Sequence, residues 1–205
     1  MKLEAFFDCS SPWAYLGFEA VQPLAAELGL DLELRPVLVG GVFNAVNKSV
    51  YHLRESVPAK MAWVAKDLRD WSRMAGIQIH YPPPVFPVNS AKALRACILL
   101  DRRGRMIDFA RATFHAYWGL GSDISQESVL AEICRSIDVD PATVVPRLAD
   151  EDLRDELRAN VDELIARGGF GVPTFFLGGE DMYFGADRLS VLKRAVEQAR
   201  TNSFE

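Results

Sequence analysis

The sequence contains little cysteine. Its 205 residues include three, Cys9, Cys97 and Cys134. Their number is odd, and their spacing matches neither Cys-x-x-Cys nor a metal-ligand pattern, so they indicate neither a dithiol motif nor a metal site. Free cysteine is among the residue types most often buried, and we therefore expect all three to be structural thiols in the core.

Long apolar runs and an excess of basic residues are also absent. No stretch approaches the roughly 20 apolar residues of a membrane-spanning helix. Glu4 and Asp8 interrupt the N-terminal apolar run before a secretory signal could form, which predicts a cytoplasmic protein. Acidic residues outnumber basic ones by 28 to 23, for a net charge of -5, and this argues against a nucleic-acid surface. A small-molecule partner is favoured, with no nucleic acid and no membrane.

What is present suits one globular domain with a sizeable core, since 49% of the residues are hydrophobic. Residues 2–8 alternate in polarity and predict a strand. Ser11 is a favourable N-cap and Pro12 a favourable first residue for a helix that extends to Leu28, and Gly29 would end it. A second strand is expected over residues 31–36, which completes a strand-helix-strand unit.

The rest of the chain changes to helical periodicity and then returns to strands. Helices are expected at residues 58–76, 91–100, 106–118, 126–137, a short segment after Asp140-Pro141, and 150–166. Two strands at 174–177 and 182–184 and a helix at 187–199 complete the chain. This order predicts an α/β thioredoxin-like fold with a large all-helical insertion after the second strand. The thioredoxin-like domain would comprise residues 1–40 and 169–205, and the inserted domain residues 41–168.

Ser11 lies where the first strand turns into the first helix. A serine at an N-cap places its hydroxyl at the positive end of the helix dipole, where an anion is stabilised. Such a position could lower the pKa of a bound thiol, which is ordinarily about 8.5, and so favour a thiolate. Ser11 could equally serve only as the helix cap.

Two later segments could complete a binding site. A cis bond between Val172 and Pro173 would expose the backbone of Val172 to a ligand lying beside it as an added strand, although isolated X-Pro bonds are usually trans. At the last helix, backbone N–H groups could hold a carboxylate and Asp187 an amino group; Asp187 could also be a plain cap.

The sequence resembles the 2-hydroxychromene-2-carboxylate isomerases and kappa-class glutathione transferases, in the DsbA-like branch of the thioredoxin fold. The resemblance rests on motifs in family order along almost the whole chain. They are residues 8–16 (DCSSPWAYL), Arg35-Pro36, residues 40–44 (GGVFN), Asn47-Lys48, residues 82–84 (PPP), residues 170–175 (FGVPTF) and residues 184–189 (FGADRL).

The resemblance implies glutathione as the cofactor and a homodimer. Ser11 would hold the glutathione sulfur, Val172-Pro173 would pair with the cysteinyl backbone, and Asp187 would meet the γ-glutamyl end. Asn47 would reach glutathione or substrate, and Lys48 a carboxylate, unless it is only a surface lysine. Ala186 stands where relatives carry Ser, Asn or Gln. A side-chain hydrogen bond to glutathione is therefore missing, and its loss could weaken glutathione binding.

The resemblance implies isomerisation of a conjugated or aromatic 2-oxo acid or chromene carboxylate, through reversible addition of the glutathione thiolate. Four aromatic residues could line the substrate pocket, or could belong to the core: Trp13, Phe43, Trp63 and Trp118. A kappa-class glutathione transferase or peroxidase is the alternative, and a non-catalytic glutathione-binding scaffold a further one. A dithiol oxidoreductase is excluded because Ser11 and Ala14 stand where it needs cysteines.

Overall fold

The sheet joins the two ends of the chain. In a computed structural model that describes residues 1–50 and 57–202, four strands lie in the order β2-β1-β3-β4. Strand β1 (Lys2–Phe7) pairs in parallel with β2 (Asp31–Pro36) and antiparallel with β3 (Thr174–Leu177), which pairs antiparallel with β4 (Asp181–Phe184). The N-terminal strand β1 therefore lies inside the sheet with a neighbour on each side. This pairing fixes the point at which the chain leaves β1 and turns into the next segment.

The register of the sheet is fixed by burial. Ala5, at the middle of β1, lies opposite Leu34 of β2 and Phe175 of β3, and all three side chains are buried. A shift of one residue would turn these side chains to the other face.

Helix α1 (Pro12–Glu27) forms the crossover between β1 and β2. It begins at the Ser11 cap, whose Oγ accepts a hydrogen bond from the N–H of Ala14 at 3.2 Å. It ends near Gly29, which has a φ of 56° that suits glycine. Both predicted ends of this helix are confirmed within a residue or two.

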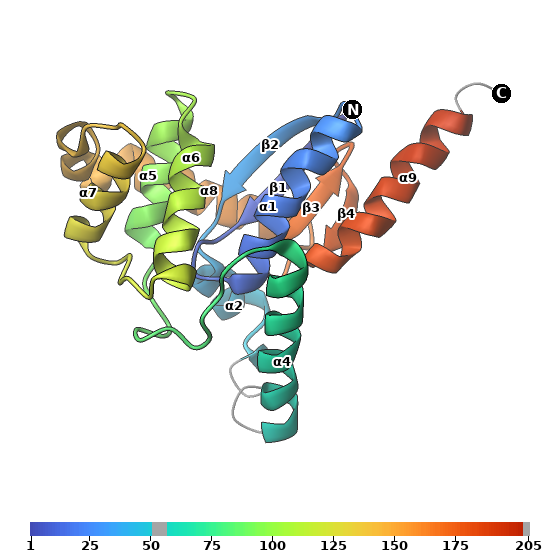
Figure 1. Cartoon of the computed structure of the whole chain (residues 1–205). Helices are drawn as coiled ribbons and strands as arrows, with labels where there is room; N and C mark the ends of the chain where they lie inside the picture. The colour runs from blue at the N-terminus through green and yellow to red at the C-terminus, as the bar shows by residue number, and fades with distance from the viewer. Residues whose placement is uncertain (51–56, 203–205) are drawn as a thin grey trace.

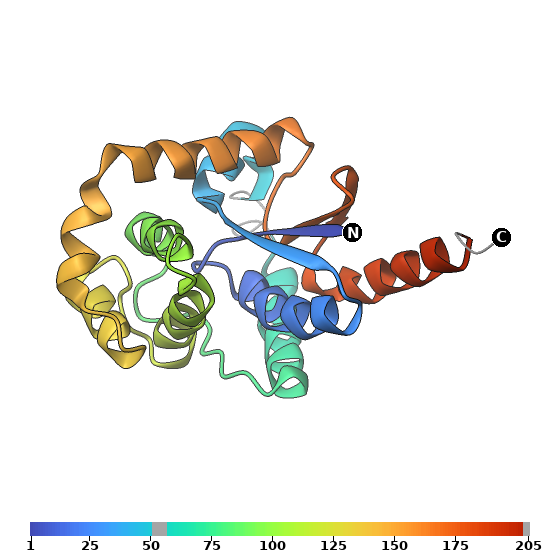
Figure 2. The same ribbon diagram turned by 90° about the horizontal axis from the view of Figure 1, so that it is seen from above.

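Helices occupy most of the chain between β2 and β3, as the sequence predicted. They are α2 (Val39–Val46), α4 (Pro58–Ala75), α5 (Ala91–Asp101), α6 (Met106–Phe114), α7 (Glu127–Ser136) and α8 (Glu151–Ala166), and the chain closes with α9 (Leu189–Asn202) after β4. In Figure 1, α5, α6 and α7 lie together beyond the β2 edge of the sheet, whereas α4 extends away from the body of the molecule. Figure 2 shows the sheet between α1 and α9 on one side and α2 and α8 on the other.

Three local expectations needed correction. Helix α2 was not predicted, because its Gly40 and Gly41 have low helix propensity. The helix expected over residues 106–118 ends at Phe114 and continues as a π-helical turn from His115 to Gly119. The short helix after Asp140-Pro141 is instead two 3₁₀ segments, Pro141–Thr143 and Val145–Ala149.

The core is rich in aromatic side chains next to the start of α1. Phe114 lies 4.8 Å from the ring of Tyr15 in a stacked arrangement and 5.3 Å from the ring of Phe18. Phe7, the last residue of β1, contacts the same cluster. This packing fixes the start of α1 against α6 of the insertion, and it thereby stabilises the turn between β1 and α1. No helix in the described ranges is long and apolar enough to cross a bilayer.

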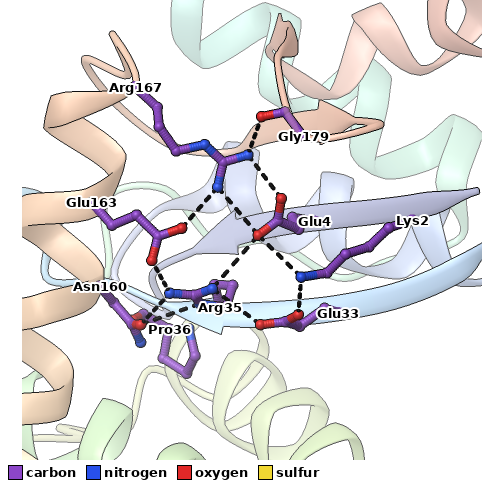
Figure 3. A network of polar contacts seen from close by, with 9 residues as sticks. All are labelled: Lys2, Glu4, Glu33, Arg35, Pro36, Asn160, Glu163, Arg167 and Gly179. Atoms are coloured by element: carbon purple, nitrogen blue, oxygen red, sulfur yellow. Dashed lines mark hydrogen bonds and ion pairs between the residues drawn. The ribbon is translucent and has the colours of Figure 1, made fainter.

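A network of charged side chains connects α8 to the sheet (Figure 3). Arg167 reaches the nearly buried Glu4 of β1 at 2.8 Å, Glu163 at 2.9 Å and the carbonyl oxygen of Gly179 at 2.7 Å. Arg35 of β2 contacts Glu163 as well. Each buried charge in the network has an opposite charge beside it.

Candidate active site

A cleft of about 670 Å³ opens at the N-terminal end of α1. It lies among the turn between β1 and α1, helices α2 and α4, the loop that leads to α5, and the segment before β3. Its walls are mainly apolar, with polar groups gathered at one end. The residues that line it include Asp8, Ser10, Ser11, Trp13, Phe43, Asn47, Lys60, Met61, Val64, Leu68, Tyr81, Phe86, Ser90, Val172 and Phe184.

Ser11 and the first N–H groups of α1 face this cleft. The Ser11 hydroxyl accepts from the Ala14 N–H and therefore still has its own proton to donate. Pro12 has no N–H, and the N–H of Trp13 makes no hydrogen bond within the described residues. One hydroxyl proton and one unpaired N–H at the positive end of a 16-residue helix form a site that suits an anion.

A buried carboxyl group supports the same turn. Asp8 is fully buried; its carboxylate accepts from the N–H of Ser10 at 2.8 Å and from the N–H of Val39 at 2.8 Å. It thus connects the Ser11 turn to the start of α2. Burial raises the pKa of Asp8, and the hydrogen bonds only partly oppose this effect. The Ser90 hydroxyl, which is also buried, faces Asp8 without a hydrogen bond of standard geometry.

The segment before β3 offers an unpaired backbone. The Val172–Pro173 bond is cis, and within the described residues the N–H and C=O of Val172 make no backbone hydrogen bond. Pro173 packs against α1 so closely that a Cβ on Gly17 would lie 2.8 Å from its Cγ. Val172 therefore offers a donor and an acceptor that have no partner within the described residues, on the wall of the cleft that Ser11 also lines.

Asn47 connects α2 to this segment. Its Nδ2 donates to the carbonyl oxygen of Phe170 at 3.0 Å. The ring of Phe170 lies 4.4 Å from that of Phe184 at the end of β4. The far wall of the cleft is therefore built from three parts of the chain that are distant in sequence.

The structure brings five of the predicted site residues to the cleft wall: Ser11, Trp13, Phe43, Asn47 and Val172. Asp187 and Ala186 lie outside this wall, in the 3₁₀ segment Ala186–Arg188 that follows it. The Asp187 carboxylate is exposed and lies 3.4 Å from the Arg188 guanidinium.

Of the five residues predicted to bind substrate, three are not among the residues that line the cleft: Trp118, Trp63 and Lys48. Trp118 is fully buried within the π-helical turn, where its Nε1 donates to the carbonyl oxygen of Cys9 at 3.0 Å. Trp63 is 57% exposed on another face of α4. Lys48 is exposed beside α2 and is not among the wall residues.

Several wall residues were not singled out from the sequence. Tyr81 and Phe86 on the loop before α5 form an aromatic wall and pack on the ring of Trp118. Asp8 was visible as a short acidic side chain two residues before a turn, a position from which it commonly accepts a backbone N–H. No local signal indicated Lys60.

The thiols are structural, as predicted from their residue type. All three cysteines are buried and unbridged. Burial raises the pKa of Cys9 well above its usual range, and contact with the Cys97 thiol raises it further. The described residues contain no cluster of side chains suited to a metal ion.

The fold and this cleft define a thioredoxin-like protein with a helical insertion between its second and third strands, in which serine occupies the cap that faces the cleft. The DSBA-like thioredoxin domain family matches residues 2–197, and the chain belongs to it.

The chain is also distantly homologous to two groups of enzymes. It is 27% identical over 198 residues to the 2-hydroxychromene-2-carboxylate isomerase of Pseudomonas putida, covering 96% of this chain and 94% of that protein. It is 28% identical over 196 residues to glutathione S-transferase kappa 2 of Caenorhabditis elegans, covering 90% and 86%. A solved structure of a 2-hydroxychromene-2-carboxylate isomerase superposes with a TM-score of 0.83 at 25% identity, covering 99% and 98%.

Proposed function

We propose that this chain is a glutathione-dependent isomerase that acts on a conjugated or aromatic 2-oxo acid or chromene carboxylate. The observation that carries the proposal is the Ser11 hydroxyl at the N-terminus of α1, which lines the same cleft as the N–H of Trp13 and the backbone of Val172, both without a partner within the described residues. These groups fit a cysteinyl peptide: a strand-like backbone would pair with Val172 while its sulfur lies at the helix end.

When bound, glutathione would supply a thiolate that adds reversibly to an electron-poor carbon and permits rotation about the former double bond. Ser11 donates its hydroxyl proton to the sulfur, and the dipole of α1 further favours the charged form. Asp187 meets the γ-glutamyl amino group, and Asn47 holds the peptide from the α2 side. Trp13, Phe43, Tyr81 and Phe86 enclose the apolar part of the substrate.

Two variants separate the role of Ser11 in the helix cap from its role at the sulfur. Ser11→Ala should cost about 1 kcal/mol of stability and Ser11→Gly only a few tenths, because glycine is tolerated at an N-cap. Both should raise the pKa of the bound thiol by about one to two units, because each removes one hydrogen bond to a charged group.

Titration calorimetry with glutathione, combined with ultraviolet titration of the bound thiolate, measures both effects. Ser10→Ala is the matched control, since this neighbouring hydroxyl also lies at the cleft. If wild type does not bind millimolar glutathione, or if both Ser11 variants keep the wild-type thiol pKa, the proposal is wrong.

The second candidate function is that of a kappa-class glutathione transferase, which would conjugate glutathione to a substrate or use it to reduce a peroxide. It is favoured by the 28% identity to a kappa-class transferase over most of both chains. The two reactions differ in their use of thiol. Isomerisation leaves total glutathione unchanged over many turnovers, whereas conjugation or peroxide reduction consumes it. Assaying free thiol alongside substrate absorbance distinguishes them. If the protein binds glutathione but catalyses neither reaction, it would be a non-catalytic glutathione-binding scaffold. Ala186, which lacks the polar side chain of relatives, is the feature that favours this alternative.

A further inference from the structure

Lys60 is the one basic residue among the described residues that line the cleft, and Asp8 is the one acidic residue there. The two differ in exposure: Asp8 is buried, whereas Lys60 is exposed and free to meet a ligand. A carboxylate that enters this largely apolar cleft would therefore be attracted to the ammonium group of Lys60 on α4.

Lys60 is also without an acidic partner in the part of the chain that the structure describes. It makes no ion pair or side-chain hydrogen bond within the described residues. Apart from Lys48, the other lysines are each paired with an acidic side chain, namely Lys2, Lys66, Lys92 and Lys193. Among the lysines, the combination of a free ammonium group and a place on the cleft wall belongs to Lys60.

The position of Lys60 contradicts the usual pattern for a helix start. It lies in the first turn of α4, which has no acidic residue and no side-chain cap from Val57. Helices α6, α7 and α8 each have an acidic residue in their first turn. A cation beside a positive helix end is unfavourable for the helix alone, and such local conflicts are expected at functional sites.

We infer that Lys60 is the carboxylate-binding residue of the cleft and sets its preference for anionic ligands. Met61, Val64 and Leu68 follow it on α4 and would contact the apolar body of the same ligand. The inference rests on the proposed function, in which two molecules bring a carboxylate: glutathione through its glycyl end, and the conjugated acid. Both present the same group to Lys60, and the experiment distinguishes them.

The experiment compares the binding of carboxylates with the binding of their amides. Titration calorimetry is carried out with glutathione and its glycinamide, and with naphthalene-2-carboxylate and naphthalene-2-carboxamide. The proteins are wild type, Lys60→Met, which keeps the length and apolar stem, and Lys60→Arg, which keeps the charge. Lys48→Met is the matched control, because Lys48 is exposed, has no ion pair within residues 1–50 and 57–202, and is not among the cleft-lining residues.

Lys60→Met should weaken a carboxylate ligand about five- to tenfold while changing its amide less than about twofold, as expected for one charge contact at the mouth of an apolar cleft. Lys60→Arg should restore most of the affinity, and Lys48→Met should have no effect. A loss confined to glutathione assigns the glycyl carboxylate, and a loss confined to the naphthoate assigns the acid substrate.

The inference is overturned if Lys60→Met leaves both carboxylates at wild-type affinity, or if it weakens the amides equally. Failure of the proposed function looks different: wild type would not bind glutathione, or its bound thiol would be insensitive to Ser11. In that case, comparing the binding of naphthalene-2-carboxylate with that of naphthalene-2-carboxamide still tests whether Lys60 binds a carboxylate.

Discussion

Two buried carboxyl groups, Glu4 within β1 and Asp8 just after it, have opposite surroundings. Glu4 faces the charged network of Figure 3, where hydrogen bonding to Arg167 lowers its pKa. Asp8 lies at the cleft with backbone N–H groups but no cation beside it, and burial raises its pKa. Both side chains are buried, but the Arg167 guanidinium outweighs the effect of burial at Glu4, whereas Asp8 is the more deeply enclosed of the two and has no cation to offset its burial.

This contrast separates the structural and the chemical parts of the molecule. In the network, each ion is satisfied, which fixes α8 to the sheet and leaves little capacity for a ligand. At the cleft, by contrast, the Ser11 proton, the Trp13 N–H and the backbone of Val172 have no hydrogen-bond partner among the residues that the structure describes.

Breaking the network should have the largest effect on stability. Arg167→Met leaves Glu4 as a buried carboxylate without its principal partner, which should lower the free energy of unfolding by about 3–5 kcal/mol. Urea unfolding monitored by circular dichroism measures it. Arg102→Met is the control, because Arg102 pairs with Asp152 and Glu156 at the surface and should cost less than about 1 kcal/mol. A cost as small as that of the control would contradict a structural role for the network. Affinity for glutathione should not change.

Removing the carboxyl group at the cleft should affect both stability and binding. Asp8→Ala leaves the N–H groups of Ser10 and Val39 without an acceptor, at an expected cost of about 2–4 kcal/mol. Because the Ser11 turn and α2 are then no longer connected, glutathione affinity should fall as well, unlike in Arg167→Met. Asp8→Asn keeps one acceptor oxygen and should cost about half as much. Parallel urea unfolding and calorimetry test this, and unchanged glutathione affinity in Asp8→Ala would show that Asp8 only stabilises the fold.

Local signals predicted the parts of the site that lie near each other in sequence. Ser11 and Pro12 define the start of α1 through capping chemistry alone, and the structure places the cap where the sequence did. The order of strands and helices likewise follows from periodicity, because apolar residues recur at a spacing of about two in strands and about 3.6 in helices.

The remaining features depend on tertiary packing. Periodicity places Trp118 on the apolar face of a helix, but whether that face meets the cleft or the core depends on the packing around it, and the structure encloses Trp118 in the core. Trp63 and Lys60 are three residues apart on α4, yet Lys60 lines the cleft whereas Trp63 is exposed, and nothing in the local sequence distinguishes the two. The cis bond at Val172 is likewise set by tertiary context, since most X-Pro bonds are trans.

The smallest predicted effect is on the pH dependence of stability, where the two carboxyl groups should act with opposite sign. The folded pKa of Glu4 lies below its reference value of 4.5, so Glu4 binds fewer protons in the folded state than in the unfolded state. Its stabilising contribution is complete above that value and is lost as the pH falls through the folded pKa. The stability difference between wild type and Glu4→Gln should therefore shrink on acidification.

Asp8 should show the reverse. Its folded pKa lies above its reference value of 3.8, so the folded state holds the proton more tightly. This contribution is complete below 3.8 and is lost as the pH rises through the folded pKa, so the stability of wild type relative to Asp8→Asn should increase on acidification. Urea unfolding of the three proteins between about pH 3.5 and 6.5 measures both slopes. If the two differences change in the same direction, the Asp8 carboxyl has a favourable charge partner in solution, and the contrast between the paired network and the unpaired cleft fails.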